Sequence, residues 1–121
     1  MTAAELLFFD ECPQALPVYE ALRAWALNRW PETAIRVQKT QITFGRPKGY
    51  AVVSLPRRKA ERAAGAVVLS FSLPQADASP RIIAKAQISA RRWTHHVLLN
   101  EPEDLDAQVR AWVEVSAALG E

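Results

Sequence analysis

The spacing of hydrophobic residues changes its period twice along this chain. From Pro13 onward, apolar side chains recur at helical spacing. This helix should end near Trp30, because Pro31 disfavours helical geometry in the residue before it. Residues 100–104 combine a capping residue, a proline and acidic side chains, which mark the start of a second helix that Gly120 would stop. We therefore predict one amphipathic helix near each end of the chain.

Between these helices the period is two, which is typical of strands with one buried face. We predict six strands near residues 34–38, 40–45, 50–55, 66–73, 81–89 and 93–99. Residues 45–49 and 89–92 read as turns, residues 74–80 as a loop, and residues 56–64 as either a basic loop or a short helix. The short links favour an antiparallel meander. The predicted fold is a single α+β domain over residues 1–121. It has two layers, an antiparallel sheet of about five or six strands and an N-terminal and a C-terminal helix packed on one face.

One face of the predicted sheet has no helix to cover it. Side chains alternate across a strand, so the apolar positions should collect under the helices and the polar positions on the open face. In the fifth strand, for example, Ile82, Ala84 and Ala86 are expected under the helices. The open face is expected to carry Lys39, Gln41, Tyr50, Ser54, Ser70, Ser72, Lys85, Gln87 and His96.

The chain has only two histidines, and they are adjacent in the last predicted strand. His95 should therefore point toward the helices, hydrogen-bonded at the edge of the core, and His96 toward the open face. Two histidines on opposite faces cannot bind one ion, and no cysteine or acid stands at ligand spacing beside them. No phosphate-binding glycine loop, nucleophile elbow or metal-binding motif occurs in the sequence. We predict neither a metal site nor a cofactor.

The distribution of charge is uneven, although the net charge is only +2. Residues 36–92 carry twelve basic and two acidic side chains, and both ends of the chain are acidic. A basic middle can serve an anionic partner, but acidic helices can also simply compensate a basic sheet. No apolar run approaches the roughly 20 residues that cross a membrane. The single cysteine, Cys12, cannot form an internal disulfide, which favours a cytoplasmic location.

Several short motifs together resemble a known family. They are the run Lys39–Phe44, the pair His95–His96, and the acidic stretch Glu103–Asp106 that leads to Trp112, with similarity also at Phe8–Phe9 and Tyr19–Leu22. In this order and spacing they resemble a bacterial family, domain of unknown function 5655. The resemblance implies a small cytoplasmic domain without an established activity, so it supplies no catalytic roles. By position, the lysine, the glutamine and the histidines of the family would be Lys39, Gln41, His95 and His96.

Three functions remain open, and we prefer the first, which is not enzymatic. It is a binding module that holds an anionic small molecule or peptide on the open face through a few placed polar groups. Its candidate residues are Lys39, Gln41, Tyr50, Ser70, Ser72, Lys85, Gln87 and His96. The second is a nucleic-acid-binding accessory domain that uses basic turns with aromatic neighbours. Its candidate residues are Arg46, Lys48, Arg57, Arg58, Lys59, Arg62, Arg91 and Arg92. The third is an enzyme with His96 as general base beside a serine, lysine or tyrosine. A homodimer is compatible with all three, and a membrane partner is not expected.

Overall fold

In the computed structural model, which describes residues 1–119, six strands form one antiparallel sheet. The strands are β1 (Ala34–Val37), β2 (Ile42–Gly45), β3 (Gly49–Ser54), β4 (Val67–Leu73), β5 (Ile82–Ser89) and β6 (Arg92–Leu99). The helices are α1 (Ala3–Phe8), α2 (Leu16–Arg29), α3 (Lys59–Ala63) and α4 (Ala107–Leu119), with 3₁₀ turns η1 (Pro13–Ala15) and η2 (Pro102–Asp104). The predicted α+β class and the antiparallel sheet are confirmed. Gly120 lies outside the described residues.

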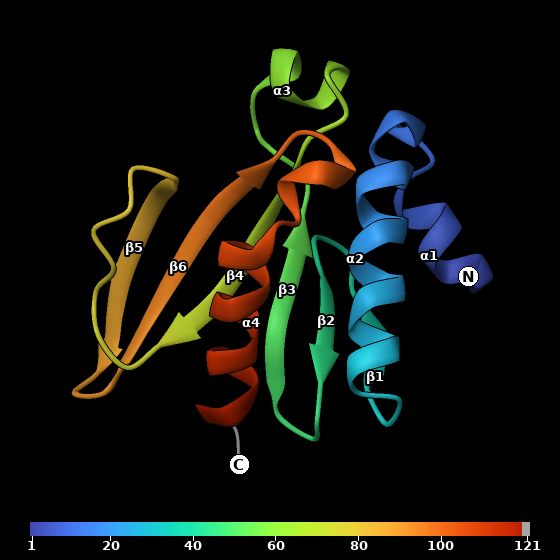
Figure 1. The fold of residues 1–121 in the computed structure, drawn as a ribbon. Coiled ribbons are helices and arrows are strands. Elements are labelled where there is room, and N and C mark those ends of the chain that lie inside the picture. The colour runs from blue at the N-terminus through green and yellow to red at the C-terminus, as the bar shows by residue number, and fades with distance from the viewer. Residues whose placement is uncertain (120–121) are drawn as a thin grey trace.

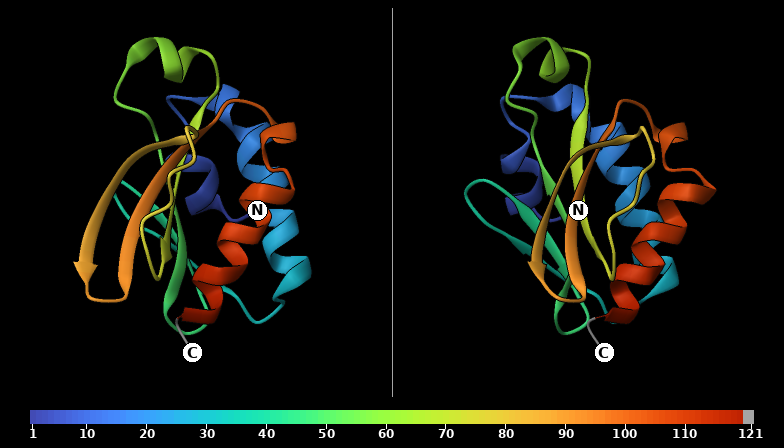
Figure 2. Two further views of the ribbon diagram at one scale, coloured as in Figure 1. Left: turned by 60° about the vertical axis from the view of Figure 1, so that its left-hand side comes forward. Right: turned by 90° about the vertical axis from the view of Figure 1, so that its left-hand side faces the viewer.

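The two long helices, α2 and α4, lie on one face of the sheet, and no helix among residues 1–119 covers its other face (Figures 1 and 2). The apolar positions predicted for the helices and the central strands form the core between the two layers. Leu22 of α2 and Val113 of α4 are fully buried, as are Phe44 and Leu69 of the sheet beneath them. The alternation of apolar and polar residues thus places one face of each central strand under the helices.

The strand order, β1-β2-β3-β4-β6-β5, differs from the expected meander. β6 lies between β4 and β5, so the chain leaves β4, skips one place and returns through the β5–β6 hairpin. The connecting loop crosses β6 on the helix side, where the backbone N–H of Asp77 donates to Nε2 of His95 at 2.9 Å. The indole N–H of Trp112 donates to the Asp77 carboxylate at 3.2 Å. The loop therefore covers β6 on the helix side. His95 points to that side, as predicted, but it is fully buried beneath the loop and not at the edge of the core.

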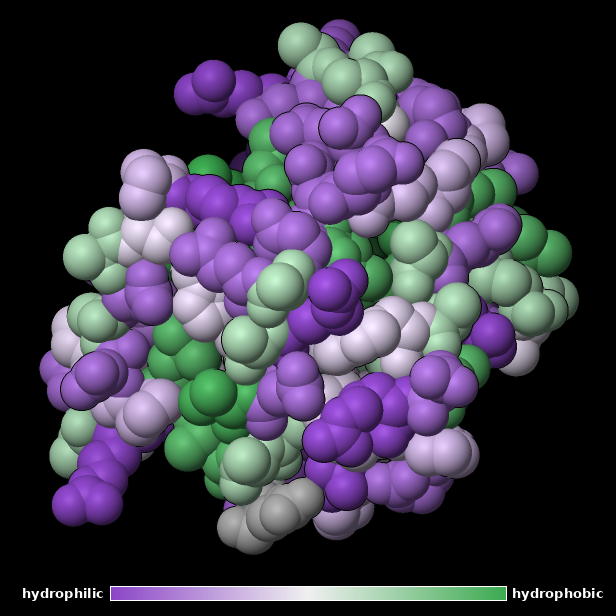
Figure 3. Space-filling view, viewed as in Figure 1, coloured by the Kyte–Doolittle hydropathy of each residue, from purple (hydrophilic) through white to green (hydrophobic). Residues whose placement is uncertain are grey.

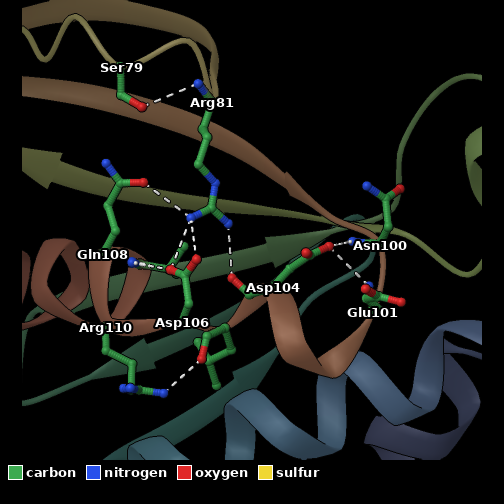
Figure 4. A network of polar contacts seen from close by, with 10 residues as sticks. Ser79, Arg81, Asn100, Glu101, Asp104, Asp106, Gln108 and Arg110 are labelled. Carbon is green, nitrogen blue, oxygen red and sulfur yellow. Dashed lines mark hydrogen bonds and ion pairs between the residues drawn. The ribbon is translucent and has the colours of Figure 1, made fainter.

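A polar network anchors this loop to the start of α4 (Figure 4). The guanidinium of Arg81 donates to both carboxylate oxygens of Asp106, at 2.8 and 2.9 Å, and to the backbone carbonyl of Asp104. Asp106 also accepts from the backbone N–H of Val109, which caps α4. This helix was expected to begin at residues 100–104. It begins later because Leu105 leaves helical geometry, with ψ at 65°.

Four face predictions in β5 are wrong, those for Ala84, Lys85, Ala86 and Gln87. The β5–β6 register shifts between Ile82 and Ala84, after which Ala84 pairs with His96 and Lys85 with His95. Directly opposed residues share a face, so Lys85 and Gln87 lie on the helix side, and the alanines lie on the open face. The irregularity shifts the phase of the alternation. Because β5 is an edge strand whose side chains are almost all exposed, burial does not oppose the reversal.

The prediction that Tyr50 faces the open side is also wrong. The β2–β3 register shifts between Phe44 and Gly45, so that both Tyr50 and Ala51 are buried. The Tyr50 ring lies 4.9 Å from the ring of Trp30, and its hydroxyl is hydrogen-bonded to Thr33 at 2.9 Å. Tyr50 is therefore a core residue at the end of α2.

The helix α1 was not predicted. Thr2 caps it through a capping box with Glu5, whose side chain is only 1% exposed. The carboxylate of Glu5 accepts hydrogen bonds from Tyr19 and, at 2.7 Å, from Arg23, both on α2. One buried polar cluster thus fixes α1 against α2.

Candidate functional site

A cavity of about 740 Å³ opens at one end of the sheet and brings together segments that are far apart in the sequence. The β1–β2 hairpin contributes Lys39 and Gln41, and the end of β3 contributes Ser54. Arg57 and Arg62 come from α3 and the segment before it. The residues on the α1 side are Leu7, Phe8, Asp10 and Glu11. Its volume lies within the range of small-molecule sites, about 300–1,000 Å³.

The hairpin that carries Lys39 is held by local hydrogen bonds. The backbone N–H of Gln38 donates to the carbonyl of Gln41 at 2.8 Å. The Gln41 side-chain amide donates to the side-chain oxygens of Gln38 and Thr43, at 3.2 and 3.3 Å. These contacts fix the Gln41 side chain at the rim of the cavity, while Lys39 remains exposed.

The opposite wall is held through the backbone of Arg62. Its carbonyl accepts from the side-chain amide of Gln14 at 2.8 Å and from the thiol of Cys12 at 3.4 Å. Gly65 then reverses the chain with a φ of +83°, and a Cβ at this position would lie 2.6 Å from the carbonyl oxygen of Gln14. The basic segment is therefore tied to the turn that precedes α2, and this tie keeps Arg62 at the cavity.

The cavity is lined by charges of both signs. Lys39, Arg57 and Arg62 supply three positive charges, and Asp10 and Glu11, in the turn that follows α1, supply two negative ones. All five side chains are exposed, although Nε of Arg62 donates to the backbone carbonyl of Pro56 at 2.5 Å. Arginine and lysine on different walls suit an anion that is held between them.

The eight candidate ligand residues do not form one site. Lys39 and Gln41 line the cavity, whereas Tyr50 is in the core, and Lys85 and Gln87 lie on the helix side of β5. The other three, Ser70, Ser72 and His96, lie in the middle of the open face, where β4 pairs with β6.

In the middle of the open face, a serine and a histidine are in direct contact. Ser70 and His96 are opposed in the β4–β6 ladder, and Ser70 Oγ lies 2.6 Å from His96 Nδ1. Burial lowers the pKa of His96, and the neighbouring His95 lowers it further. The neutral form of His96 is therefore favoured. The pairing with Ser70 also confirms the predicted position of His96 on the open face.

A shallow hollow of about 130 Å³ adjoins this pair. The β3–β4 pairing ends at Val52 and Ser70, beyond which Ser116 of α4 bridges the two strands. Its hydroxyl donates to the carbonyl of Tyr50 at 2.6 Å and accepts from the N–H of Ser72 at 2.9 Å. The hollow lies where the strands diverge, with Ser72 and Thr94 among its lining residues.

The candidate nucleic-acid residues lie at opposite ends of the sheet. The segment around α3 lies at one end, and the β2–β3 and β5–β6 turns lie at the other (Figure 1). At the second end, Nε of Arg46 lies 2.7 Å from Oε1 of Glu32, and the guanidinium of Arg46 lies over the ring of Trp30. Lys48 and Arg91 are exposed, and Arg92 donates to the carbonyl of Leu119 at 3.4 Å. At the first end, Arg57, Arg58, Lys59 and Arg62 are all exposed.

Sequence reasoning assigned the cavity residues to two different hypotheses. Lys39 and Gln41 belonged to the anion-binding set, and Arg57 and Arg62 to the nucleic-acid set. The residues from the α1 side were missed altogether, since α1 itself was not predicted. An available signal was the pair Leu6–Leu7, apolar residues in a segment for which no strand or long helix was expected.

Within residues 1–119, no group of three or more histidine, cysteine, aspartate or glutamate side chains is arranged to hold a metal ion. In the same part of the chain, no helix is both long and apolar enough to cross a membrane.

The fold and the cavity describe a small two-layer α+β domain with one open sheet face. The chain belongs to the family DUF5655, a domain of unknown function, whose sequence pattern matches residues 8–117. This confirms the family expected from the sequence. No curated protein and no solved structure matches the chain.

Proposed function

We propose that the protein is a binding module for a small anionic ligand, which it holds in the cavity at the end of the sheet. The observation that carries the proposal is the convergence of Lys39, Arg57 and Arg62 on one cavity from separate parts of the chain. Gln41 and Ser54 add hydrogen-bonding groups beside these charges. The single cysteine also supports a cytoplasmic location, and the proposal retains the bacterial setting that the resemblance implied.

The experiment compares two neighbouring arginines. Both Arg57 and Arg58 are exposed, but only Arg57 lines the cavity. Isothermal titration with inorganic phosphate would measure the dissociation constant for the wild type, Arg57→Gln and Arg58→Gln. We expect Arg57→Gln to weaken binding about tenfold, as for the loss of one charge-assisted hydrogen bond, and Arg58→Gln to change it by less than about twofold.

Equal losses in the two variants would show that phosphate responds only to the general positive charge of this segment. No detectable phosphate binding by the wild type would count against an anion site. In that case, binding of a mixed oligonucleotide at low salt would favour the nucleic-acid alternative, whose affinity should fall steeply as salt rises.

One contact favours a second candidate function, an enzyme that uses Ser70 as nucleophile and His96 as general base. With its Nδ1 unprotonated, His96 can accept the Ser70 proton at the observed 2.6 Å. A fluorophosphonate probe would form an oxygen–phosphorus bond at Ser70 and release fluoride, while His96 takes the proton. Intact mass spectrometry should then show one adduct in the wild type and in Ser72→Ala but none in Ser70→Ala. An unlabelled wild type would remove this candidate.

A further inference from the structure

The anion cavity continues into an apolar groove along α1. The groove, of about 360 Å³, is lined by Ala4, Leu7, Phe8, Val37, Gln38 and Lys39. Leu7, Phe8 and Lys39 also line the anion cavity, so the two spaces share a wall and a cation. The anion cavity on one side of this shared wall is polar and basic, whereas the groove on the other side is lined mainly by alkyl and aromatic groups.

The exposure of Leu7 supports a role for this groove. Leu7, which lines both spaces, is 72% exposed, and its neighbour Leu6, which lines neither, is 49% exposed. Figure 3 shows hydrophobic side chains gathered along the edge of the molecule where α1 lies. Large apolar side chains that are exposed together often mark a place where another molecule is bound.

We infer that the ligand of the proposed anion site is a single-chain amphipathic anion, with a phosphate or carboxylate head and a hydrocarbon tail. This inference rests on the proposed function, since it places the head between Lys39, Arg57 and Arg62. The tail lies in the groove against Leu7 and Phe8. The shared Lys39 fits this geometry, because its alkyl stem can cover apolar surface while its ammonium group meets the head.

The groove also sets a length for the tail. From Ala4 to Phe8 the helix axis advances by about 6 Å, which corresponds to roughly five methylene groups. Each methylene group that becomes fully buried should tighten binding about three- to fourfold, and the gain should level off beyond the end of the groove.

A homologous series of alkyl phosphates tests this inference. Isothermal titration would compare methyl, butyl, hexyl and decyl phosphate below their critical micelle concentrations, with hexanol as the uncharged control. We expect the affinity to rise from methyl to hexyl and then change little, and we expect no binding of hexanol. Leu7→Ser should abolish most of the chain-length dependence, whereas Leu6→Ser, which changes the same helix outside both cavities, should leave it intact.

The outcomes separate this inference from the proposed function. Equal binding of methyl and hexyl phosphate would overturn the amphipathic ligand but leave the anion site in place. No binding of any phosphate would overturn both. Binding of hexanol as tightly as hexyl phosphate would show that the groove acts without the cations. Co-sedimentation with phosphatidic acid vesicles, without binding of free alkyl phosphates, would show that the ligand chemistry belongs to a membrane surface and would overturn a free ligand.

Discussion

Glu5 should make the stability of this protein strongly dependent on acid pH. Burial by itself raises the pKa of this carboxyl, but hydrogen bonds from Arg23, Tyr19 and the backbone of Thr2 outweigh that effect and lower its pKa to about 2. Because the folded pKa is below the unfolded one, the contribution is fully present above the unfolded pKa. It is lost as the pH falls from there toward the folded pKa.

The magnitude follows from the two pKa values. The shift from 4.5 in the unfolded chain to about 2 in the folded protein corresponds to about 3 kcal/mol in the free energy of unfolding. A single domain is usually stable by only about 5–15 kcal/mol, so this is a large fraction. Glu5→Gln imitates the protonated carboxyl and should cost a similar amount near neutral pH, because Arg23 loses its buried anion.

Urea unfolding, followed by tryptophan fluorescence from about pH 7 down to about pH 3, would measure this effect. The wild type and Glu5→Gln should differ by about 3 kcal/mol at neutral pH and converge as the pH falls. Glu20→Gln, which removes an exposed carboxylate from α2, is the control and should leave the pH dependence close to that of the wild type. A difference between the wild type and Glu5→Gln that stays constant with pH would refute the electrostatic explanation.

Three further substitutions test particular contacts through the free energy of unfolding in urea. His95→Ala should cost about 2–3 kcal/mol, since it empties a fully buried site and leaves the backbone N–H of Asp77 without its acceptor. His96→Ala should cost less than about 1 kcal/mol. Equal losses in the two variants would show that the difference in burial does not control stability. Asp106→Ala should cost about 1 kcal/mol through the lost cap of α4, and faster amide exchange in the first turn of α4 would locate the effect. Gly65→Ala should cost more than about 1 kcal/mol, because its positive φ and the nearby carbonyl of Gln14 exclude a Cβ, and a neutral result would show that the turn can relax.

The sequence predicted most of the fold, because burial imposes a clear period on the elements that meet the core. In β4 the alternation of Val67, Leu69 and Phe71 with half-buried residues appears unchanged in the structure. Pro31 correctly marked the end of α2, whose last residue is Arg29. These features depend on local chemistry and on one buried face, and both can be read along the chain.

The errors have a different physical origin. The faces of Lys85 and Tyr50 depend on register shifts. Such a shift adds an unpaired residue to one strand of a pair, and the alternation of apolar and polar residues in the sequence does not reveal it. The place of β6 in the sheet depends on how the loop at Asp77 packs against His95 and Trp112. Such long-range contacts leave no periodic signal in the sequence.

The candidate site was predicted only in fragments, for a related reason. Lys39 and Arg57 are separated by two strands along the chain, and both lie at one end of the sheet because β2 pairs antiparallel with β3, where Ile42 opposes Val53. The contact between Arg62 and Gln14 then holds α3 to the turn before α2 at the same end. Basic residues in turns carry no indication of which other turn they will meet. The predicted open polar face therefore identified only Lys39, Gln41 and Ser54 among the residues that line the cavity, and the others come together only in the tertiary structure.

The insertion of β6 between β4 and β5 has a consequence for how the sheet opens and how the chain can vary. β5 is bonded on one side only, to β6, and almost all of its side chains are exposed, so its detachment would uncover little of the core. Amides of β5 should therefore exchange through fraying of this strand alone, while those of β4 and β6 require a much larger opening. For the same reason, residues can be inserted at the β5–β6 turn with little effect on the folding of the rest of the sheet.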